Sequence, residues 1–160
     1  QIGLFLTSSN ISLPDLRLEY NVTRPWTYTH PDFSYTHREK VLGSPYGPSS
    51  KAIRLESFYF PKPKIIIKSS FEHVLKGLGY GASILDNYDN RNEEYDWNTK
   101  FFLEDKQKFS ELNISLYYIL SDLLRLRSTI SISETFNPYL YSENQRYREN
   151  EFIIGLDFQW

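Results

Sequence analysis

Several stretches of the sequence alternate between apolar and polar side chains with a period of two residues. In the clearest of them, Leu16, Leu18, Tyr20 and Val22 alternate with Arg17, Glu19, Asn21 and Thr23. The same alternation recurs over residues 65–72, 111–121, 124–132 and 152–160. Because successive side chains of a β-strand point to opposite faces, this period predicts strands with one apolar and one polar face. A slip of one residue would exchange the two faces, so the register is fixed.

With weaker patterns over residues 1–8 and 52–60, these stretches predict seven antiparallel strands. The connections between them alternate in length. Short turns are expected at residues 9–14, 61–64 and 121–123, and long loops at residues 27–51, 75–107 and 137–148. Outer-membrane barrels have this asymmetry, with short periplasmic turns and long external loops. A soluble sandwich has no reason to alternate so regularly.

The hydropathy of the chain is compatible with a membrane only if strands cross it. No apolar run approaches the length of about 20 residues that a transmembrane helix needs. A transmembrane strand needs about 9–11 residues, of which only every second one is apolar, so a mean hydropathy of −0.51 is no obstacle. The 13 Tyr, 11 Phe and 3 Trp suit the aromatic girdles of such barrels. Composition alone leaves an aromatic-rich soluble β-sandwich open.

These features predict an all-β fold, an antiparallel up-and-down transmembrane β-barrel integral to the outer membrane of a Gram-negative bacterium. Residues 1–160 are expected to belong to one barrel domain. An odd number of strands would place the two chain ends on opposite sides, whereas single-chain bacterial barrels have even numbers. We therefore expect either that these residues are the C-terminal part of a larger barrel, or that one strand escapes the pattern.

The last seven residues combine alternating apolar side chains with an aromatic end. Gly155, Phe158 and Trp160 are its landmarks. This ending resembles the β-signal that the barrel-assembly machinery reads during insertion. It implies that this machinery is a partner, as is outer-membrane lipid. The alternative is an ordinary edge strand of a soluble sheet.

Sequence motifs in the first half of the chain indicate a family. Residues 16–30 read LRLEYNVTRPWTYTH, residues 35–37 read YTH, and residues 42–48 read LGSPYGP. They resemble the "LRLEY…RP(W/Y)xYxH" and "YxH…LGxPxGP" stretches of the Wzi-like capsule-assembly family, which includes large relatives in gliding bacteria. Residues 54–61 and 77–79 are similar to that family's next hairpin. The resemblance implies a large outer-membrane barrel that binds or organises capsular or exopolysaccharide. Residues 86–94, which are acidic and rich in Asn, match no family motif.

Sugars are bound by aromatic rings that stack on apolar C–H patches and by planar polar groups that bond hydroxyls. One predicted loop and its approach are rich in both kinds of side chain. The candidate glycan-binding residues are Trp26, Tyr28, His30, Tyr35, His37 and Arg38. The alternative is that Trp26 and Tyr28 continue the apolar face of the preceding strand as girdle residues, while the histidines bond within the loop.

The sequence gives little support for nucleic-acid binding, metal binding or catalysis. The formal net charge of −2 offers no basic surface for nucleic acid, so no such partner is expected. Of the three histidines, His30 and His37 lack a third ligand at a suitable spacing. His73, near Ser69 and Ser70, is the one candidate for a catalytic Ser–His pair and carries no recognisable motif. We expect no enzyme activity, no cofactor and no metal site.

Charged residues occur in two further settings. Acidic residues crowd residues 86–96, where they form either a calcium site without EF-hand spacing or a solvated loop. Polar-face positions carry both signs of charge, as a wet or plugged barrel interior requires. They specify no permeant, and comprise Arg17, Glu19, Lys68, Glu72, Arg125 and Arg127.

The leading functional hypothesis is a non-enzymatic outer-membrane barrel whose external loops bind or organise surface polysaccharide. A second is a structural or interaction subunit of an envelope complex, such as a surface secretion or gliding apparatus, with other envelope proteins as partners. A third is a diffusion porin.

Overall fold

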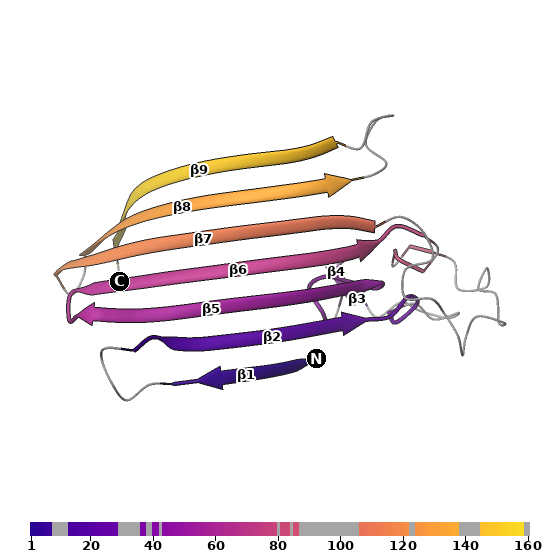
Figure 1. The fold of residues 1–160 in the computed structure, drawn as a ribbon, viewed down its shortest axis with the longest axis horizontal. Coiled ribbons are helices and arrows are strands. Elements are labelled where there is room, and N and C mark those ends of the chain that lie inside the picture. The colour runs from indigo at the N-terminus through magenta and orange to yellow at the C-terminus, as the bar shows by residue number, and fades with distance from the viewer. Residues whose placement is uncertain are drawn as a thin grey trace.

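A computed structural model describes residues 1–7, 13–28, 36–37, 40–41, 43–79, 81–83, 85–86, 106–121, 124–137 and 145–158. Its strands are β1 (Ile2–Leu6), β2 (Asp15–Thr23), β3 (Thr36–His37), β4 (Lys40–Val41), β5 (Ser50–Lys62), β6 (Ile65–Gly77), β7 (Lys106–Ser121), β8 (Leu124–Asn137) and β9 (Gln145–Phe158). Seven of them form one antiparallel sheet in the order β1-β2-β5-β6-β7-β8-β9 (Figure 1). β3 and β4 pair as a small separate hairpin. No described residues form a helix of the length and hydropathy that a bilayer crossing requires.

The prediction of an all-β chain with seven antiparallel strands is confirmed. The sheet is open, with β1 and β9 at opposite edges (Figure 1). The expected continuation of the second strand's apolar face to Trp26 and Tyr28 is wrong, because β2 ends at Thr23. Pro25 lacks the N–H that a strand ladder needs, and Trp26 has a φ of 62°, which is incompatible with an extended strand.

The register of the strands places apolar residues beside apolar residues, and polar residues beside polar residues, in rows across the sheet. One row runs Leu4, Leu18, Leu55, Phe71, Leu112 and Ile132 from β1 to β8. The adjacent row runs Glu19, Arg54, Glu72, Glu111, Ser133 and Glu149 from β2 to β9. Directly paired residues share a face and successive residues alternate, so the sheet has one apolar and one polar face.

The apolar face is the exposed one. Leu116 on β7 is 46% exposed and Ile154 on β9 is 66% exposed, whereas Glu56 and Ser115 on the polar face are 4% and 9% exposed. Among the described residues the only buried hydrophobic side chains are those of Ala52, Val74 and Ala82. The described strands therefore form a single layer, and no second layer of described residues covers its apolar side chains.

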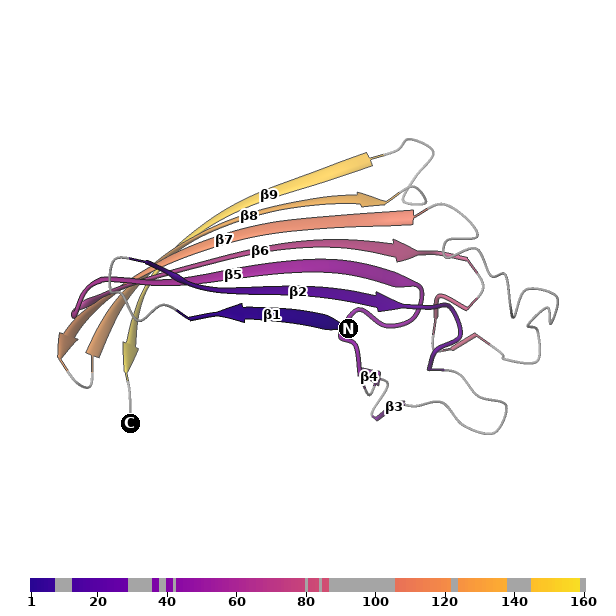
Figure 2. The ribbon, with the colours of Figure 1, turned by 60° about the horizontal axis from the view of Figure 1, so that its bottom comes forward.

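The sheet is curved, and its polar face lies on the inside of the curve. Figure 2 shows the strands bowed along their length, with the β3–β4 hairpin on the concave side. The segment after this hairpin, residues 43–49, reaches the polar face, since the hydroxyl of Tyr46 bonds the carboxylate of Glu72. The polar face is therefore concave and the apolar face convex.

The apolar residues of the convex face form a band that crosses the sheet obliquely. It spans residues 16–22 on β2, 112–120 on β7 and 152–156 on β9. Its centre is residue 19 on β2 and residue 154 on β9, whereas the register counterpart of Glu19 on β9 is Glu149. From β2 to β7 the centre of the band moves five residues toward the end of the sheet where the short turns lie, because the register counterpart of Glu19 on β7 is Glu111 and the centre there is Leu116. From β7 to β9 the centre stays in one register row, that of Leu116, Ser128 and Ile154. Averaged over the five strand pairs from β2 to β9, the shift is about one residue per strand. With a rise of about 3.4 Å per residue and strands about 4.8 Å apart, this average corresponds to a mean strand tilt of about 35° relative to the band.

Candidate binding site at the loop end of the concave face

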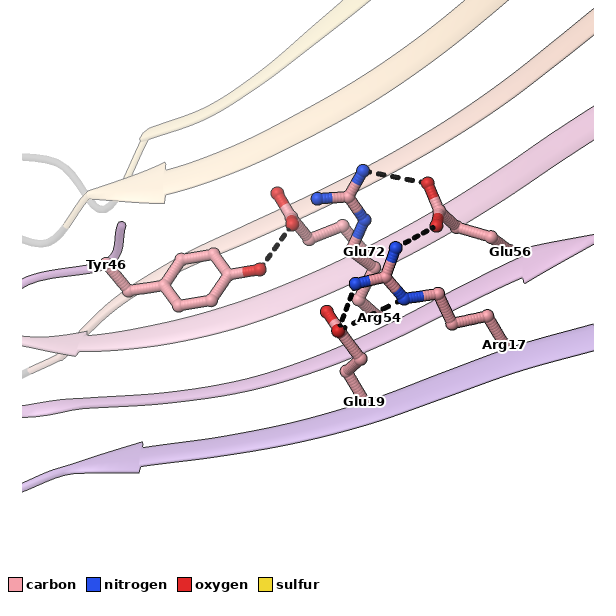
Figure 3. A network of polar contacts seen from close by, with 6 residues as sticks. All are labelled: Arg17, Glu19, Tyr46, Arg54, Glu56 and Glu72. Atoms are coloured by element: carbon pink, nitrogen blue, oxygen red, sulfur yellow. Dashed lines mark hydrogen bonds and ion pairs between the residues drawn. The ribbon is translucent and has the colours of Figure 1, made fainter. Parts of the chain in front are cut away.

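A charged network joins β2 and β5 on the concave face (Figure 3). The guanidinium of Arg17 donates to one oxygen of Glu19 at 3.1 and 2.5 Å and lies 3.5 Å from Glu56. Arg54 donates to the other oxygen of Glu56 at 2.8 Å. Glu56 is almost fully buried, so its charge depends on the two guanidinium groups that face it.

Tyr46 connects the loop of residues 43–49 to the same face (Figure 3). Its hydroxyl donates to Glu72 Oε1 at 2.6 Å, and Glu72 is the register partner of Arg54. Burial raises the pKa of Tyr46, and the hydrogen bond to Glu72 and the negative charge of that carboxylate raise it further. The phenol therefore stays protonated at physiological pH and acts as a donor.

Backbone and ammonium contacts fix the position of this loop. Lys76, on β6 beyond the apolar band, donates to the carbonyls of Tyr46, at 3.2 Å, and Pro48. Burial lowers the pKa of Lys76 to about 8. The backbone N–H of Ser49 donates to Arg24, and that of Gly77 to Ser49. The loop is thus tied to β6 and to the end of β2, which holds the Tyr46 ring in one place.

A pocket of about 350 Å³ opens beside Tyr46 at the loop end of the concave face. Its lining includes Tyr46, Glu72, Lys76, Gln107, Phe109 and Thr135. The lining thus combines the two aromatic rings of Tyr46 and Phe109 with a carboxylate, an amide, an ammonium group and a hydroxyl. Rings can stack on the C–H faces of a sugar, and these polar groups provide both donors and acceptors for its hydroxyls. We call this the loop-end pocket.

Two of the predicted glycan-binding residues, Trp26 and Tyr28, have described side chains, and both hold loops together. The backbone N–H of Trp26 donates to the Gly81 carbonyl at 3.0 Å. Its indole packs on Gly81 so closely that a Cβ there would lie 2.6 Å from the ring. The Tyr28 hydroxyl accepts from the Ser44 N–H at 2.8 Å. These contacts occupy part of each ring and differ from the predicted girdle position on a strand.

The other four candidate glycan-binding residues have no described side chain. His30, Tyr35 and Arg38 lie outside the described residues, and for His37 only the backbone, in β3, is described. Glycan binding by these residues stays a prediction.

The terminal signal and the acidic stretch are partly described. Gly155 lies on the concave face, where a Cβ would stand 3.7 Å from the Arg127 guanidinium. Phe158 pairs with Leu124 at the end of β9, and Trp160 lies outside the described residues. Asp86 accepts from the N–H groups of Gly81 and Ser83, so it closes a local turn. The rest of the stretch to residue 96 is not described, and no trio of metal-ligating side chains gathers in the parts of the chain that are.

His73 lies on the convex face, and its partner is one that sequence reasoning missed. Its Nδ1 lies 2.8 Å from Ser110 Oγ, across the β6–β7 pair. Ser69 and Ser70, the predicted neighbours, are register partners of Ile114 and Asn113 instead. The pairing joins residues far apart in sequence, so only the register of β6 on β7 reveals it.

Comparison with known proteins does not add a family. No family model, curated protein or solved structure matches the chain.

Proposed function

We propose that this chain forms part of the wall of an outer-membrane β-barrel, with its convex face against lipid. The observation that carries the proposal is the exposed apolar face of the sheet opposite a concave face that holds Glu56, Arg54 and Arg17 as ion pairs. In water, such an apolar face would be costly to expose, and in lipid it is the required surface. The concave face then lines the barrel interior.

The obliquity of the apolar band supports the same proposal. A band that is level in a bilayer must cross the strands at their tilt angle. The tilt of about 35° that the register implies falls within the range of about 35–45° found in transmembrane barrels. A sheet packed against a second protein layer has no such requirement.

The two open edges of the sheet indicate that the proposed barrel contains further strands. Among the described strands, β9 has no neighbour along its 14-residue outer edge and β1 has none along its five-residue outer edge. Each unpaired backbone group would cost several kcal/mol in hydrocarbon. We propose that strands outside these 160 residues complete the wall, so that the barrel is larger than the described sheet.

Single cysteines test the membrane assignment, because the chain contains none of its own. A spin label on Ile114→Cys, on the convex face, is expected to collide with lipid-dissolved oxygen and not with a water-soluble nickel complex. A label on the adjacent Asn113→Cys, on the concave face, is expected to show the reverse preference. The complete protein in bilayers is the sample. Shielding of position 114 from both reagents, or solubility of the folded protein without detergent, would contradict the assignment.

We further propose that the loop-end pocket binds surface polysaccharide without catalysing its conversion. The pocket combines the Tyr46 and Phe109 rings with Glu72 and Gln107 at the end of the sheet where the long connections lie. In an outer-membrane barrel this end faces the exterior. A polymer at the cell surface would therefore meet the pocket first.

Removing the Phe109 ring is expected to weaken binding of the organism's purified surface polysaccharide about tenfold, as loss of a stacking contact of roughly 1.5 kcal/mol implies. Tyr46→Phe, which keeps the ring and removes the hydrogen bond to Glu72, should weaken it less. Isothermal titration of the detergent-solubilised protein measures both. Phe152→Ala on the convex face of β9 is the matched control and should bind normally. Equal losses in all three variants would argue against the pocket.

A further inference from the structure

On β6 to β9, the side chains of the convex face change from apolar to polar and charged where the apolar band ends on the side of the long loops. Next to the apolar row of Phe71, Leu112 and Ile132, the same face carries polar and charged side chains. These are His73, Ser110, Glu134 and Arg148 in one register row and Lys108, Phe136 and Arg146 in the next. We call these seven residues the rim patch. Six of them, all except Arg148, line a shallow pocket of about 220 Å³.

The rim patch is predominantly cationic. Lys108, Arg146 and Arg148 are positively charged, and Glu134 is its one acid. The Arg146–Glu134 contact is 3.9 Å long between side chains that are 76% and 51% exposed, so it neutralises little of this charge. Lys108 lies over the Phe136 ring at 5.6 Å, which places its ammonium group at the pocket. An anion would find several donors within one pocket.

The position of the rim patch restricts which anion would occupy it. A molecule bound there has the cationic side chains on one side and the apolar band on the other. A soluble anion would use only the first of these surfaces. A lipid with a phosphorylated headgroup would use both surfaces. Its phosphate would bind Lys108 and the arginines, and its acyl chains would lie along Phe71, Leu112 and the residues of the apolar band that follow them toward the short turns.

We propose that the rim patch binds the phosphate groups of lipid headgroups in the leaflet that surrounds the loop end of the barrel. Arginine presents a planar fork of donors suited to phosphate oxygens, and lysine adds a point charge. When Ser110 donates to His73 Nδ1, Nε2 of His73 carries the proton and is a further donor. This inference rests on the proposed membrane location.

The test compares two double variants of the complete protein that remove equal charge. Lys108→Gln with Arg148→Gln alters the rim patch and leaves the Arg146–Glu134 pair in place. Lys62→Gln with Lys64→Gln alters exposed lysines at the opposite, short-turn end of the sheet. Each protein is reconstituted in phosphatidylcholine vesicles containing diphosphoryl lipid A, or the same lipid A after dephosphorylation. Lipid retained after extraction into mild detergent is counted by native mass spectrometry.

We expect the unaltered protein and the short-turn variant to retain diphosphoryl lipid A at least tenfold better than the dephosphorylated lipid. The rim variant should lose about tenfold of this preference, because it lacks two of the three cations of the rim patch. Absence of any preference in a protein that passes the cysteine labelling test would overturn the inference and leave the membrane assignment intact. Failure of that labelling test would overturn both the membrane assignment and the inference of lipid binding. Displacement of the lipid by millimolar inorganic phosphate would identify a free-anion site and overturn the assignment to lipid.

Discussion

Replacing Leu116 with arginine is expected to destabilise the protein in a bilayer by about 2–4 kcal/mol, the cost of a guanidinium at the midplane on the lipid-facing side of a barrel. Leu116 lies at the centre of the apolar band on β7, and its register partners Ile67 and Ser128 hold no acid that could pair with an arginine. Urea titration of the protein in vesicles, followed by tryptophan fluorescence, measures the change in the free energy of unfolding.

Asn113→Arg is the matched control for this substitution. Asn113 lies on the same strand, three residues away and on the concave face, where a charge can remain hydrated. We expect it to change stability by less than about 1 kcal/mol, as surface substitutions generally do. The reverse ranking, with Asn113→Arg the more damaging, would mean that the concave face is the one packed away from water.

The faces of the strands were predictable from sequence because the alternation has a direct physical cause. Residues 112, 114 and 116 lie on one face and residues 113 and 115 on the other, as the period of two requires. Strand ends were less predictable. β7 begins at Lys106 and β9 at Gln145, several residues before the alternation becomes clear. At these ends both faces carry polar residues, so hydropathy no longer marks a strand that backbone pairing continues.

The loop-end pocket could be predicted only in part. Extending the period of two back from the predicted strand at residues 111–121 places Phe109 on the polar face with Glu111, whereas Gln107 was predicted to end a long loop and its place on β7 is known only from the structure. Tyr46 belongs to a loop rich in Gly and Pro, and its contact with Glu72 spans 26 residues of sequence. Such a contact depends on how the loop returns to the sheet, which local patterns do not encode.

Changing Glu56 to glutamine is expected to lower the free energy of unfolding by about 1–3 kcal/mol, the usual cost of losing a charged partner in a buried hydrogen bond. The carboxylate is nearly inaccessible to water and faces two guanidinium groups. Both arginines are about half exposed, so water compensates part of their loss and the larger penalties of fully buried pairs do not apply. The midpoint of urea unfolding in vesicles measures the effect.

Glu151→Gln provides the comparison, because Glu151 lies in the same register row, at the far edge of the concave face. It is exposed and has no ion pair among the described residues, so its loss should leave the midpoint unchanged.

Glu56→Gln should also weaken polysaccharide binding. Arg54, released from Glu56, faces its register partner Glu72 and would compete with the Tyr46 hydroxyl for that carboxylate. Adding Arg54→Gln removes this competitor and should restore binding while leaving stability low. If binding stayed low in that double variant, Glu56 would act on the loop-end pocket by another route.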